Sequence, residues 1–590
     1  MSTYSAPLLD MEFLLNHSRH HTGWCKRPDL ADLDPELIKA VLEEAGKFAT
    51  GELAALNQSG DREGCHWQDG KVTTPRGWQA AYQQFCEGGW LSLALPERIG
   101  GQGLPKLLAM AVNEMWLSAN MAFVMFHALS QGGCEILLHA ANAAQQARYL
   151  PALASGQWSL AMALTEPNAG SDLAPTTTKA FPLGDGLYRI KGQKLFITYG
   201  EHDLTENILH LVLARTPDAA PGSRGLSLFI VPKHRINPDG TLSDENDLRC
   251  VSIEHKLGLH GSPTCSISYG DQDNCIGELI GNEGQGLSLM FILMNEARLS
   301  TGLQGVATGE MAYQRALSYA SERVQGNHWQ DNKRRVALIE HPDVARMLLS
   351  MRSRVVGLRS LAYLISARID LANHCTDQNE QHTLLANVAL LTPIFKAFST
   401  EQGHEMSGTA IQIFGGMGFI EETGVAQLMR DSRVTTIYEG TTGIQAKDLL
   451  FRKILSDRGM ALSQLLDEVK ACADRLLSST ALRLPAQQLM ACSEQLQQVI
   501  DELLTDENAV QLRCYAGAVP LLDALGYLLT GWQLAELASS SQLAEYDTTY
   551  QQNMVALAQF YTAHHLVKVP ALLQTVATAE TGLADYRFNI

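Results

Sequence analysis

The chain lacks the cysteine patterns of disulfide-rich and zinc-binding proteins. Its 590 residues include 11 cysteines, an odd number, and no Cys-x-x-Cys pair occurs. Scattered cysteines of this kind are typical of a reducing compartment. The first residues also lack a cationic segment followed by an apolar core, so no signal peptide is predicted. We therefore expect a cytoplasmic protein.

Positive charge is scarce. The 45 Lys and Arg residues face 63 Asp and Glu residues, and the formal net charge is −18. This balance argues against a general nucleic-acid binder, which needs a basic footprint. No run of 18 or more apolar residues predicts a membrane span. Hydrophobic residues make up 46% of the chain, as expected for a globular protein with a large core.

Two kinds of ligand motif are also missing. The glycine-rich stretch 97–103 contains no complete G-x-G-x-x-G, and no strand–turn–helix surrounds it, so the dinucleotide fingerprint is absent. The histidine clusters at 17–21 and 564–565 lack a third ligand at suitable spacing. We therefore predict no metal site and interpret these histidines as surface or capping residues.

The periodicity of apolar residues predicts helices on both sides of a strand-rich middle. This order lacks strand–helix alternation, which excludes a Rossmann-type fold and leaves an antiparallel barrel or sandwich for the middle. A polar break covers 325–335, and an apolar stripe from Leu462 to Leu476 predicts a further helix. Predicted helices cover 35–50, 78–88, 107–138, 290–324 and 342–373, and predicted strands cover 187–191, 194–198, 208–214 and 226–231.

Glu439 is the carboxylate that stands out. Gly440 follows it directly, which indicates a turn, and Ile437 and Tyr438 make the approach apolar. Partial removal of water raises a carboxyl pKa toward the range that suits proton abstraction at neutral pH. The alternative interpretation is an ordinary solvated Glu-Gly turn.

Two other stretches indicate ligand binding. The small-residue turn 169–171 exposes backbone N–H groups and a hydroxyl, which suit a polar heterocycle or phosphate. Alternatively, Ser171 or Asp172 caps a helix. Further on, Phe196 precedes Thr198 by two positions on a predicted strand, where it can cover a ring face while the hydroxyl bonds the ring edge. The alternative is an ordinary barrel strand.

Taken in this order, these stretches resemble the acyl-CoA dehydrogenase family over about residues 36–450. The resemblance is strongest to the subgroup with a long C-terminal helical extension, the 3-methylmercaptopropionyl-CoA dehydrogenase-like proteins. It implies an α+β, mainly α fold with a helical domain, a β-barrel, a helical bundle and an extra helical domain. The predicted parts are an N-terminal arm (1–35), a helical domain (36–160), a β-barrel (161–280), a four-helix bundle with the catalytic loop (281–450) and a helical extension (451–590).

The resemblance implies FAD as cofactor, bound across a subunit boundary in a homodimer. Phe196 stands where the family commonly has tryptophan, and Gly443 stands where many members have glutamine. Without the resemblance, Gly415 and Gly416 are interpreted as a helix-packing contact. The residues implied to bind FAD are Met162, Leu164, Thr165, Gly170, Ser171, Phe196, Ile197, Thr198, Arg323, Gln412, Ile413, Gly415, Gly416, Thr441 and Gly443.

The implied reaction is α,β-dehydrogenation of an acyl-CoA thioester to the trans-2-enoyl-CoA. Glu439 removes the α-proton, a hydride passes to flavin N5, and an electron-transferring flavoprotein accepts the electrons. Some members place the base just before the arginine that matches Arg298, but Ala297 occupies that position here. The residues implied to lie near the substrate are Ser171, Asn295, Arg298 and Gly440. Without the resemblance, Arg298 is interpreted as part of a helix-surface ion pair.

Two alternatives remain open. An acyl-CoA oxidase or flavin monooxygenase shares this scaffold but reacts with oxygen. A non-catalytic nucleic-acid-associated relative carries a basic C-terminal face, whereas the C-terminal region here is rich in acidic residues. These acidic residues are Asp467, Glu468, Asp474, Glu494, Asp501, Glu502, Asp506 and Glu507. The length and branching of the acyl chain are not predicted.

Overall fold

The computed structural model describes residues 4–17, 34–237, 239–505, 510–543, 546–583 and 585–587, in two units. The first unit comprises Met1–Lys47, Lys106–Ser118 and Thr301–Ile590, and the second comprises Phe48–Pro105 and Ala119–Ser300. Most of the histidine cluster at 17–21, and the acidic residues Asp506 and Glu507, lie outside the described residues.

The N-terminal part is helical, as predicted. The Asp34 carboxylate accepts a hydrogen bond from the Leu37 N–H at 2.7 Å, so α2 begins where the sequence indicated. The long helix α5 covers the predicted segment 107–138 and is shared between the two units. The helices are α1 (Leu8–His17), α2 (Pro35–Phe48), α3 (Ala54–Glu63), α4 (Trp78–Glu87), α5 (Lys106–Ala140) and α6 (Ala143–Ala154).

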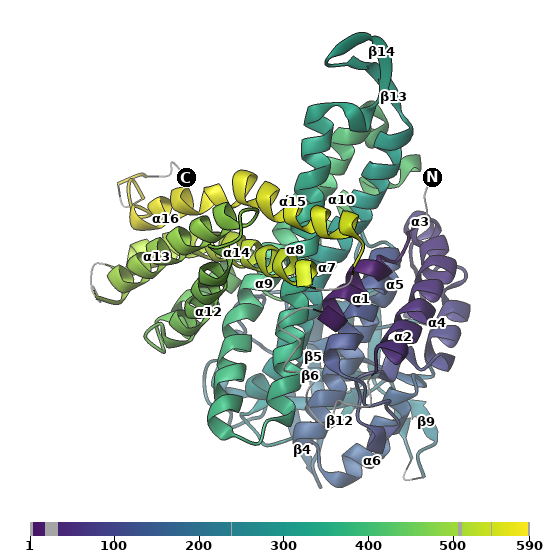
Figure 1. Ribbon diagram of the computed structural model, residues 1–590. Helices are drawn as coiled ribbons and strands as arrows, with labels where there is room; N and C mark the ends of the chain where they lie inside the picture. The colour runs from purple at the N-terminus through teal and green to yellow at the C-terminus, as the bar shows by residue number, and fades with distance from the viewer. Residues whose placement is uncertain are drawn as a thin grey trace. The chain divides into compact units, whose positions relative to one another are not determined.

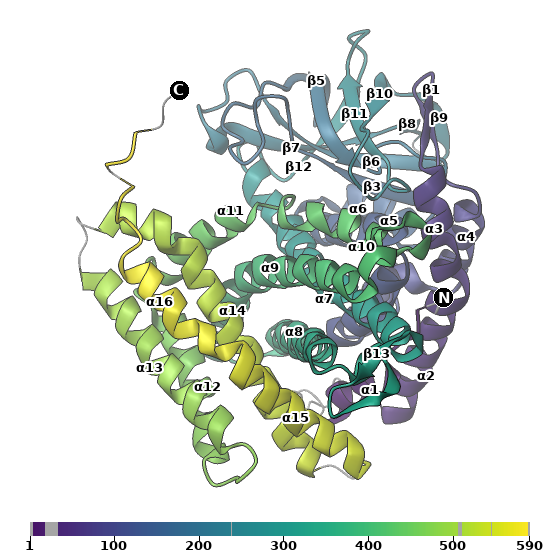
Figure 2. The same ribbon diagram turned by 90° about the horizontal axis from the view of Figure 1, so that it is seen from above.

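The middle of the chain forms one eight-stranded sheet that closes into a barrel (Figure 2). Strands β5, β12, β7 and β6 follow one another in the sheet, and β4 pairs with both β5 and β6 to close the ring. Alternate side chains therefore face a sealed interior filled by residues such as Ile190, Val212 and Phe229. The strands are β3 (Trp158–Ala163), β4 (Lys179–Gly184), β5 (Leu187–Thr198), β6 (Asn207–Arg215), β7 (Leu226–Pro232), β10 (Leu248–Ile253), β11 (Thr264–Tyr269) and β12 (Ile276–Ile280).

Two details of the sheet differ from the prediction. The runs 187–191 and 194–198 belong to a single strand, β5. The pairing is also not wholly antiparallel, because β6 runs parallel to β3 and pairs in parallel with the first residue of β4. These parallel neighbours are joined by long crossovers rather than tight hairpins, and a local alternation pattern does not record such connections. The short hairpins β1 (His66–Gln68) with β2 (Lys71–Thr73), and β8 (His234–Ile236) with β9 (Leu242–Glu245), were not predicted.

The helices after the barrel confirm the periodic segments 290–324 and 342–373. They are α7 (Gly286–Glu322), α8 (Pro342–His374), α9 (Gln378–Phe414), α10 (Val425–Ser432) and α11 (Thr442–Lys447). The predicted polar break at 325–335 is instead a hairpin of β13 (Val324–His328) and β14 (Asp331–Ala337). Almost all of its residues are exposed, so the apolar alternation that signals a strand is missing. Figure 1 shows the hairpin projecting beyond the ends of α7 and α8.

Over its described residues, the C-terminal extension contains five α-helices, and it packs against α8 and α9 (Figure 2). A side chain at Gly526 of α14 would meet the Phe398 ring at 2.2 Å, so the two helices touch backbone to ring. The Ser360 hydroxyl also donates to Gln533 Oε1 at 2.7 Å. The apolar stripe from Leu462 to Leu476 is buried, which confirms that prediction. The helices are α12 (Met460–Leu476), α13 (Arg483–Thr505), α14 (Val510–Leu543), α15 (Thr548–His564) and α16 (Val569–Ala577).

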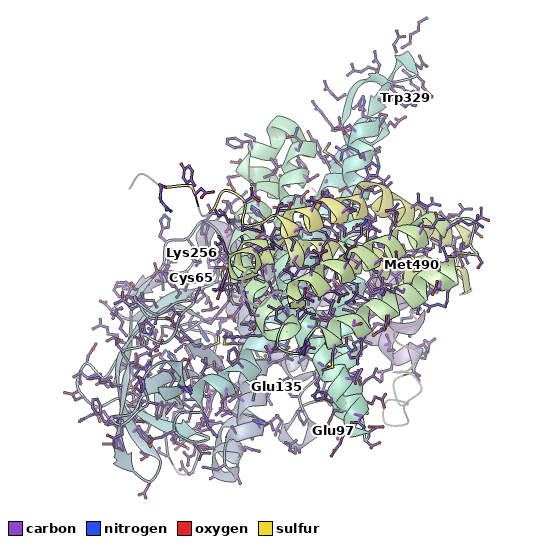
Figure 3. All side chains as sticks on the ribbon, turned by 90° about the vertical axis from the view of Figure 1, so that its left-hand side faces the viewer. Cys65, Glu97, Glu135, Lys256, Trp329 and Met490 are labelled. Atoms are coloured by element: carbon purple, nitrogen blue, oxygen red, sulfur yellow. The ribbon has the colours of Figure 1, made fainter. Side chains whose placement is uncertain are left out.

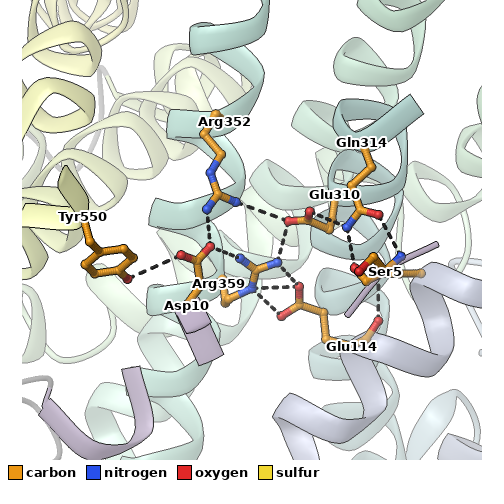
Figure 4. A network of polar contacts seen from close by, with 9 residues as sticks. Ser5, Asp10, Glu114, Glu310, Gln314, Arg352, Arg359 and Tyr550 are labelled. Carbon is orange, nitrogen blue, oxygen red and sulfur yellow. Dashed lines mark hydrogen bonds and ion pairs between the residues drawn. The ribbon is translucent and has the colours of Figure 1, made fainter. Parts of the chain in front are cut away.

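A buried network of charges joins several elements of the first unit (Figure 4). The fully buried Arg359 guanidinium of α8 donates to Glu114 of α5 at 2.6 Å and to Glu310 of α7 at 2.7 Å. It also lies 3.3 Å from Asp10 of α1, which pairs with Arg352. Residues from four helices thus meet around two guanidinium groups.

The interpretation of His564 and His565 as surface or capping residues is wrong for His565. Its ring is buried, and Nε2 lies 2.9 Å from the Ser350 hydroxyl, so it is a core residue at the end of α15. His564 is exposed and stacks on Phe560. Across the described residues, no group of three or more His, Cys, Asp and Glu side chains could hold a metal ion.

Three helical segments have the length and hydropathy of a membrane span, by composition alone. They are Lys106–Ala140, Gln378–Phe419 and Leu512–Gln542, and 72%, 67% and 61% of their most apolar windows are buried within the protein. An apolar helix that is buried on most sides is also what a large protein core contains.

Candidate active site

The predicted flavin-contacting residues of the second unit lie at the end of β3, on the loop that follows it, and at the end of β5. Met162 is in β3, and Leu164 and Thr165 follow it directly. The Thr165 carbonyl accepts a hydrogen bond from the Leu195 N–H at 2.8 Å, which ties this loop to β5. Gly170 and Ser171 are exposed at the tip of the loop. No helix follows them, so the alternative of a helix cap at Ser171 does not apply.

A buried ion pair anchors this loop. The Lys194 ammonium donates to Glu166 Oε1 and to the Leu164 carbonyl, both at 2.9 Å. The backbone N–H and hydroxyl groups of Thr177 and Thr178 donate to the same carboxylate at 2.5–3.0 Å. Burial raises the pKa of Glu166, but Lys194 and these donors outweigh it and bring the pKa to about 2. Burial lowers the pKa of Lys194 to about 8, so both groups are charged at neutral pH.

Phe196 occupies an unusual backbone conformation. Its φ is 58°, and Leu195 and Phe196 together oppose one residue of β11, which defines a β-bulge. A left-handed phenylalanine costs of order 1–3 kcal/mol and needs tertiary support. The bulge turns the ring outward, and 60% of the side chain is exposed. Ile197 is buried and Thr198 is half-buried.

Asn295 and Arg298 lie on the part of α7 that belongs to the second unit. Asn295 is exposed, whereas Arg298 is buried, with its guanidinium 6.0 Å from the centre of the Phe291 ring. Burial removes the alternative of a helix-surface ion pair. A buried arginine is retained where its charge or fork of donors has a use.

The turn that carries Glu439 belongs to the first unit. Glu439 has a φ of 55°, Gly440 has a φ of 93°, and both residues are half-buried. A left-handed glutamate is strained, and such strain gathers at functional sites. Burial, and then the charge of Glu439, raise the pKa of Tyr438, whose hydroxyl donates to Gln304 Oε1.

Two buried side chains hold the carbonyls of this turn. Gln445 Nε2 donates to the Glu439 carbonyl at 2.8 Å, and Lys396 Nζ donates to the Gly440 carbonyl at 2.7 Å. Both side chains have no exposed surface. The turn is therefore fixed from α9 and from α11.

Thr441 and Gly443, predicted to contact the cofactor, lie at the start of α11. The Thr441 hydroxyl accepts from the Ile444 N–H at 3.3 Å and so caps this helix. The neighbouring Thr442 hydroxyl donates to Glu401 Oε1 at 2.6 Å. The hydroxyl of Thr441 thus has a structural role that the sequence did not indicate.

The segment from Gln412 to Gly416 ends α9. Ile413 is buried, whereas Gln412, Gly415 and Gly416 are exposed. A Cβ added at either glycine would meet nothing within 4 Å, so these glycines do not serve helix packing. The open backbone instead permits close approach by a ligand.

Arg323 is exposed where α7 passes into the hairpin. Its N–H donates to the Tyr319 carbonyl at 2.9 Å, and its carbonyl accepts from the Leu338 N–H at 2.8 Å. The backbone of Arg323 therefore closes the base of the hairpin and leaves the guanidinium at the surface.

The structure gathers the predicted residues in two sets. The second unit holds the residues from Met162 to Thr198 together with Asn295 and Arg298, and the first unit holds Arg323 and the residues from Gln412 to Gly443. Sequence analysis missed four residues that hold these segments, namely Glu166, Lys194, Lys396 and Gln445. Lys194 carries little local signal, because Gln193 and Leu195 flank it and its partner Glu166 lies 28 residues away in the chain.

Family models match nearly the whole chain. Models of the acyl-CoA dehydrogenase N-terminal, middle and C-terminal domains match residues 35–157, 161–271 and 284–455. A model described as acetyl-CoA dehydrogenase C-terminal like matches residues 465–587, which covers most of the helical extension.

Individual relatives match over the same length. The chain is 43% identical to 3-methylmercaptopropionyl-CoA dehydrogenase of Ruegeria pomeroyi, over 96% of this chain and 97% of that protein. It is 35% identical to a butyryl-CoA dehydrogenase of Syntrophomonas wolfei, over 93% and 92%. An acyl-CoA dehydrogenase from Bacillus anthracis, solved in complex with FAD, has the same fold, with a TM-score of 0.76 at 20% identity over 94% of this chain and 90% of that chain. The chain therefore belongs to the acyl-CoA dehydrogenase family of oxidoreductases, in the form that carries an additional C-terminal helical domain.

Proposed function

We propose that this protein is an FAD-dependent dehydrogenase that converts a short, linear acyl-CoA to the trans-2-enoyl-CoA, with Glu439 as the base. The observation that carries the proposal is the left-handed, half-buried Glu439 in a turn held by Lys396 and Gln445. A chain keeps a strained carboxylate in one place only where the surrounding structure enforces it.

The residues present fit FAD. The open backbone at Gly415 and Gly416 leaves room for close approach, and the bulge presents the Phe196 ring as an apolar face. We assign the isoalloxazine ring to the loop 162–171 and to Phe196–Thr198, and the phosphates to Arg323 and the segment from Gln412 to Gly416. When bound, FAD supplies a two-electron acceptor for the hydride from the β-carbon.

Glu439 moves a proton in this reaction. The α-proton of a thioester is too weakly acidic for a free carboxylate, so a donor has to stabilise the thioester oxygen as negative charge develops. We assign this role to the Glu439 N–H, and one such donor contributes about 3–4 kcal/mol. The turn thus supplies both a base and an electrophilic contact.

The test of the base is Glu439→Gln. The variant is expected to keep FAD and to bind acyl-CoA, because the amide preserves shape, while kcat falls roughly 10²–10⁴-fold with the loss of general-base catalysis. Glu494→Gln, an exposed change on α13, is the matched control. Near-normal bleaching of the flavin by acyl-CoA in Glu439→Gln would refute the assignment.

The acyl chain is assigned from relatives. The curated proteins at 43% and 35% identity are named for 3-methylmercaptopropionyl-CoA and butyryl-CoA, both short and unbranched. We expect kcat/KM to be highest for these two esters and to fall for isovaleryl-CoA and palmitoyl-CoA. The assay uses an electron-transferring flavoprotein, the proposed acceptor, or a dye. A preference for a branched or long chain would overturn the substrate assignment.

We also propose that the protein is a homodimer in which the β13–β14 hairpin contacts the second copy. A two-stranded hairpin is marginal in water by itself, yet Trp329 near its tip is 64% exposed (Figure 3). Lys333 and Arg335 give the hairpin a charge opposite to the net −18 of the chain.

Light scattering tests the homodimer. We expect a mass of two chains, and Trp329→Ser is expected to weaken the dimer at least 10-fold, whereas Leu484→Ser, another exposed apolar residue, leaves it unchanged. A mass of four chains, or an unaffected dimer in Trp329→Ser, would contradict the proposal.

The other assignments have simple tests. Steady hydrogen peroxide formation with acyl-CoA would favour the oxidase alternative, and DNA retention at low salt would favour the nucleic-acid-associated alternative.

The ten cysteines among the described residues are free thiols, which supports the proposed cytoplasmic location. Fatty acid β-oxidation is the proposed context for a short enoyl-CoA product.

A further inference from the structure

Lys396 is a lysine that the proposed reaction does not yet use. It lies in the middle of α9 with no exposed surface, and its ammonium donates to the Gly440 carbonyl at 2.7 Å. That carbonyl belongs to the residue directly after Glu439. Burial of an ammonium is costly, so a lysine in such a position is retained only where its charge and hydrogen bonds offset the cost.

The turn that Lys396 contacts cannot hold its shape by local preference. Glu439 and Gly440 have φ values of 55° and 93°, and an isolated glutamate avoids the left-handed region. Gln445 holds the carbonyl of Glu439 and Lys396 holds the carbonyl of Gly440, so the two peptide planes after the base are both fixed. We infer that Lys396 is a positioning residue for the base, which locks the Glu439 turn through the Gly440 carbonyl and adds a buried positive charge at the residue next to the base.

Several other charged groups interact with the residues of the Glu439 turn or with their neighbours. Tyr438 lies in the turn, Glu401 of α9 accepts from Thr442, and Asp431 of α10 acts on Tyr438. Burial, and then the charge of Arg433, lower the pKa of His404. Burial, and then the charge of Glu401, raise the pKa of Asp523 of α14. Three of these groups are carboxyls and Arg433 is exposed, so Lys396 is the buried cation of the set.

The inference rests on the proposed role of Glu439, and three variants test it. Lys396→Met removes both the donor and the charge. Lys396→Gln keeps a donor and removes the charge, and Lys396→Arg keeps both in a different shape. Lys447→Met removes an exposed cation from α11, the helix that follows the turn, and is the control. Each variant is assayed for kcat, KM, FAD content, melting temperature and the pH profile of kcat/KM.

Lys396→Met is expected to lose on the order of 10–100-fold in kcat, since misplacement of a catalytic group by about 1 Å can cost roughly 100-fold. FAD content and KM stay within about threefold, because these depend on other residues. In Lys396→Met and Lys396→Gln, the acidic limb of the profile moves up by about one pH unit, since the carboxylate loses an opposite charge. Lys396→Arg is expected to keep part of kcat. A fourth variant, Lys396→Ala, serves for chemical rescue, and added ethylammonium is expected to restore part of its kcat.

Asp523 requires its own control. Burial, and then Glu401, raise the pKa of Asp523 to about 6, so this carboxyl titrates in the same range. The shift caused by Lys396→Gln is therefore measured again in an Asp523→Asn background, where it is expected to persist. A shift that disappears there would assign the profile to Asp523 and overturn the electrostatic role.

The remaining outcomes separate this inference from the proposed function. Normal kcat and pH profile in Lys396→Met, beside an inactive Glu439→Gln, would sink the role of Lys396 alone. A common fall of kcat, FAD content and melting temperature in all three Lys396 variants, with no rescue, would reduce Lys396 to a folding residue. Absence of dehydrogenation in the unchanged protein with every acyl-CoA would overturn the proposed function itself.

Discussion

Gly440 directly follows the proposed base, so its backbone conformation affects where the base lies. Its φ of 93° is unfavourable for any residue with a Cβ, and a Cβ there would lie 2.6 Å from Gln445 Nε2. Gln445 in turn holds the Glu439 carbonyl. A methyl group at position 440 thus displaces the base indirectly.

We therefore expect Gly440→Ala to lower kcat at least 10-fold while the protein still folds, since the strain amounts to about 1–3 kcal/mol. Steady-state kinetics and a melting curve check this. Gly408→Ala, near the C-terminal end of α9 with nothing within 4 Å of the new Cβ, is the control and is expected to be neutral or slightly stabilising. Equal kinetics in the two variants would contradict the importance of this turn.

At the scale of the element, strand β5 and the loop that follows β3 are joined by a buried ion pair. The Lys194–Glu166 pair joins them inside the second unit, whereas Lys191 and Asp273 form an exposed pair beside the same strand. The two pairs have similar N–O distances, 2.9 and 2.7 Å, but differ in burial. Their comparison therefore isolates the effect of burial.

Glu166→Gln is expected to destabilise the protein by about 3–5 kcal/mol, since Lys194 is left as an uncompensated buried charge, and to weaken FAD retention because the loop 162–171 loses its anchor. Asp273→Asn is expected to change little, because exposed pairs are screened by water. Urea unfolding and flavin retention on gel filtration check both variants. A Glu166→Gln variant that holds FAD as tightly as the unchanged protein would exclude a role of this pair in the cofactor loop.

At the scale of the whole molecule, the buried charges of the first unit tie distant parts of the sequence together. Arg359→Met leaves Glu114, Glu310 and Asp10 without their shared guanidinium (Figure 4). We expect a loss of about 3–5 kcal/mol in the free energy of unfolding. Arg346→Met, which breaks an exposed pair with Asp343 on the same helix, is expected to cost less than about 1 kcal/mol. Urea unfolding measures both free energies. Equal losses in Arg359→Met and Arg346→Met would contradict a stabilising role of the buried network.

Buried histidines predict how the stability of the whole chain depends on pH. Burial lowers the pKa of His202 from its ordinary 6.5 to about 3 and that of His210 to about 4. The Leu204 N–H donates to His202 Nδ1, which requires that this nitrogen be unprotonated. Between pH 6.5 and about 4, the unfolded chain therefore binds protons that the folded chain refuses, and stability falls as pH falls.

Melting temperature measured from pH 7 to pH 4 checks this. His202→Gln is expected to flatten the decline, because one of the refused protons is removed, although it lowers stability at pH 7 through the contact with Ser159. An unchanged slope in this variant would show that other groups set the acid sensitivity.

Much of the fold could be predicted because helical periodicity and strand alternation are local features of the sequence. Helical periodicity located α2, α5, α7, α8 and α12. The hairpin at 324–337 was missed because its strands are exposed on both faces and show no alternation. The pairing of β3 with β6 was missed because 43 residues separate Ala163 from Asn207, and local pattern does not report such contacts.

The same division holds for the candidate site. The sequence by itself determined the family, the order of the helical and strand regions and the residue types at Glu439, Ser171 and Arg298, because these depend on local preference and motif. Only the tertiary structure decided the left-handed backbone at Phe196 and Glu439 and the burial of Lys194 and Lys396. These features arise from contacts between segments far apart in the chain, such as Lys396 with Gly440, and strain persists only where such contacts enforce it.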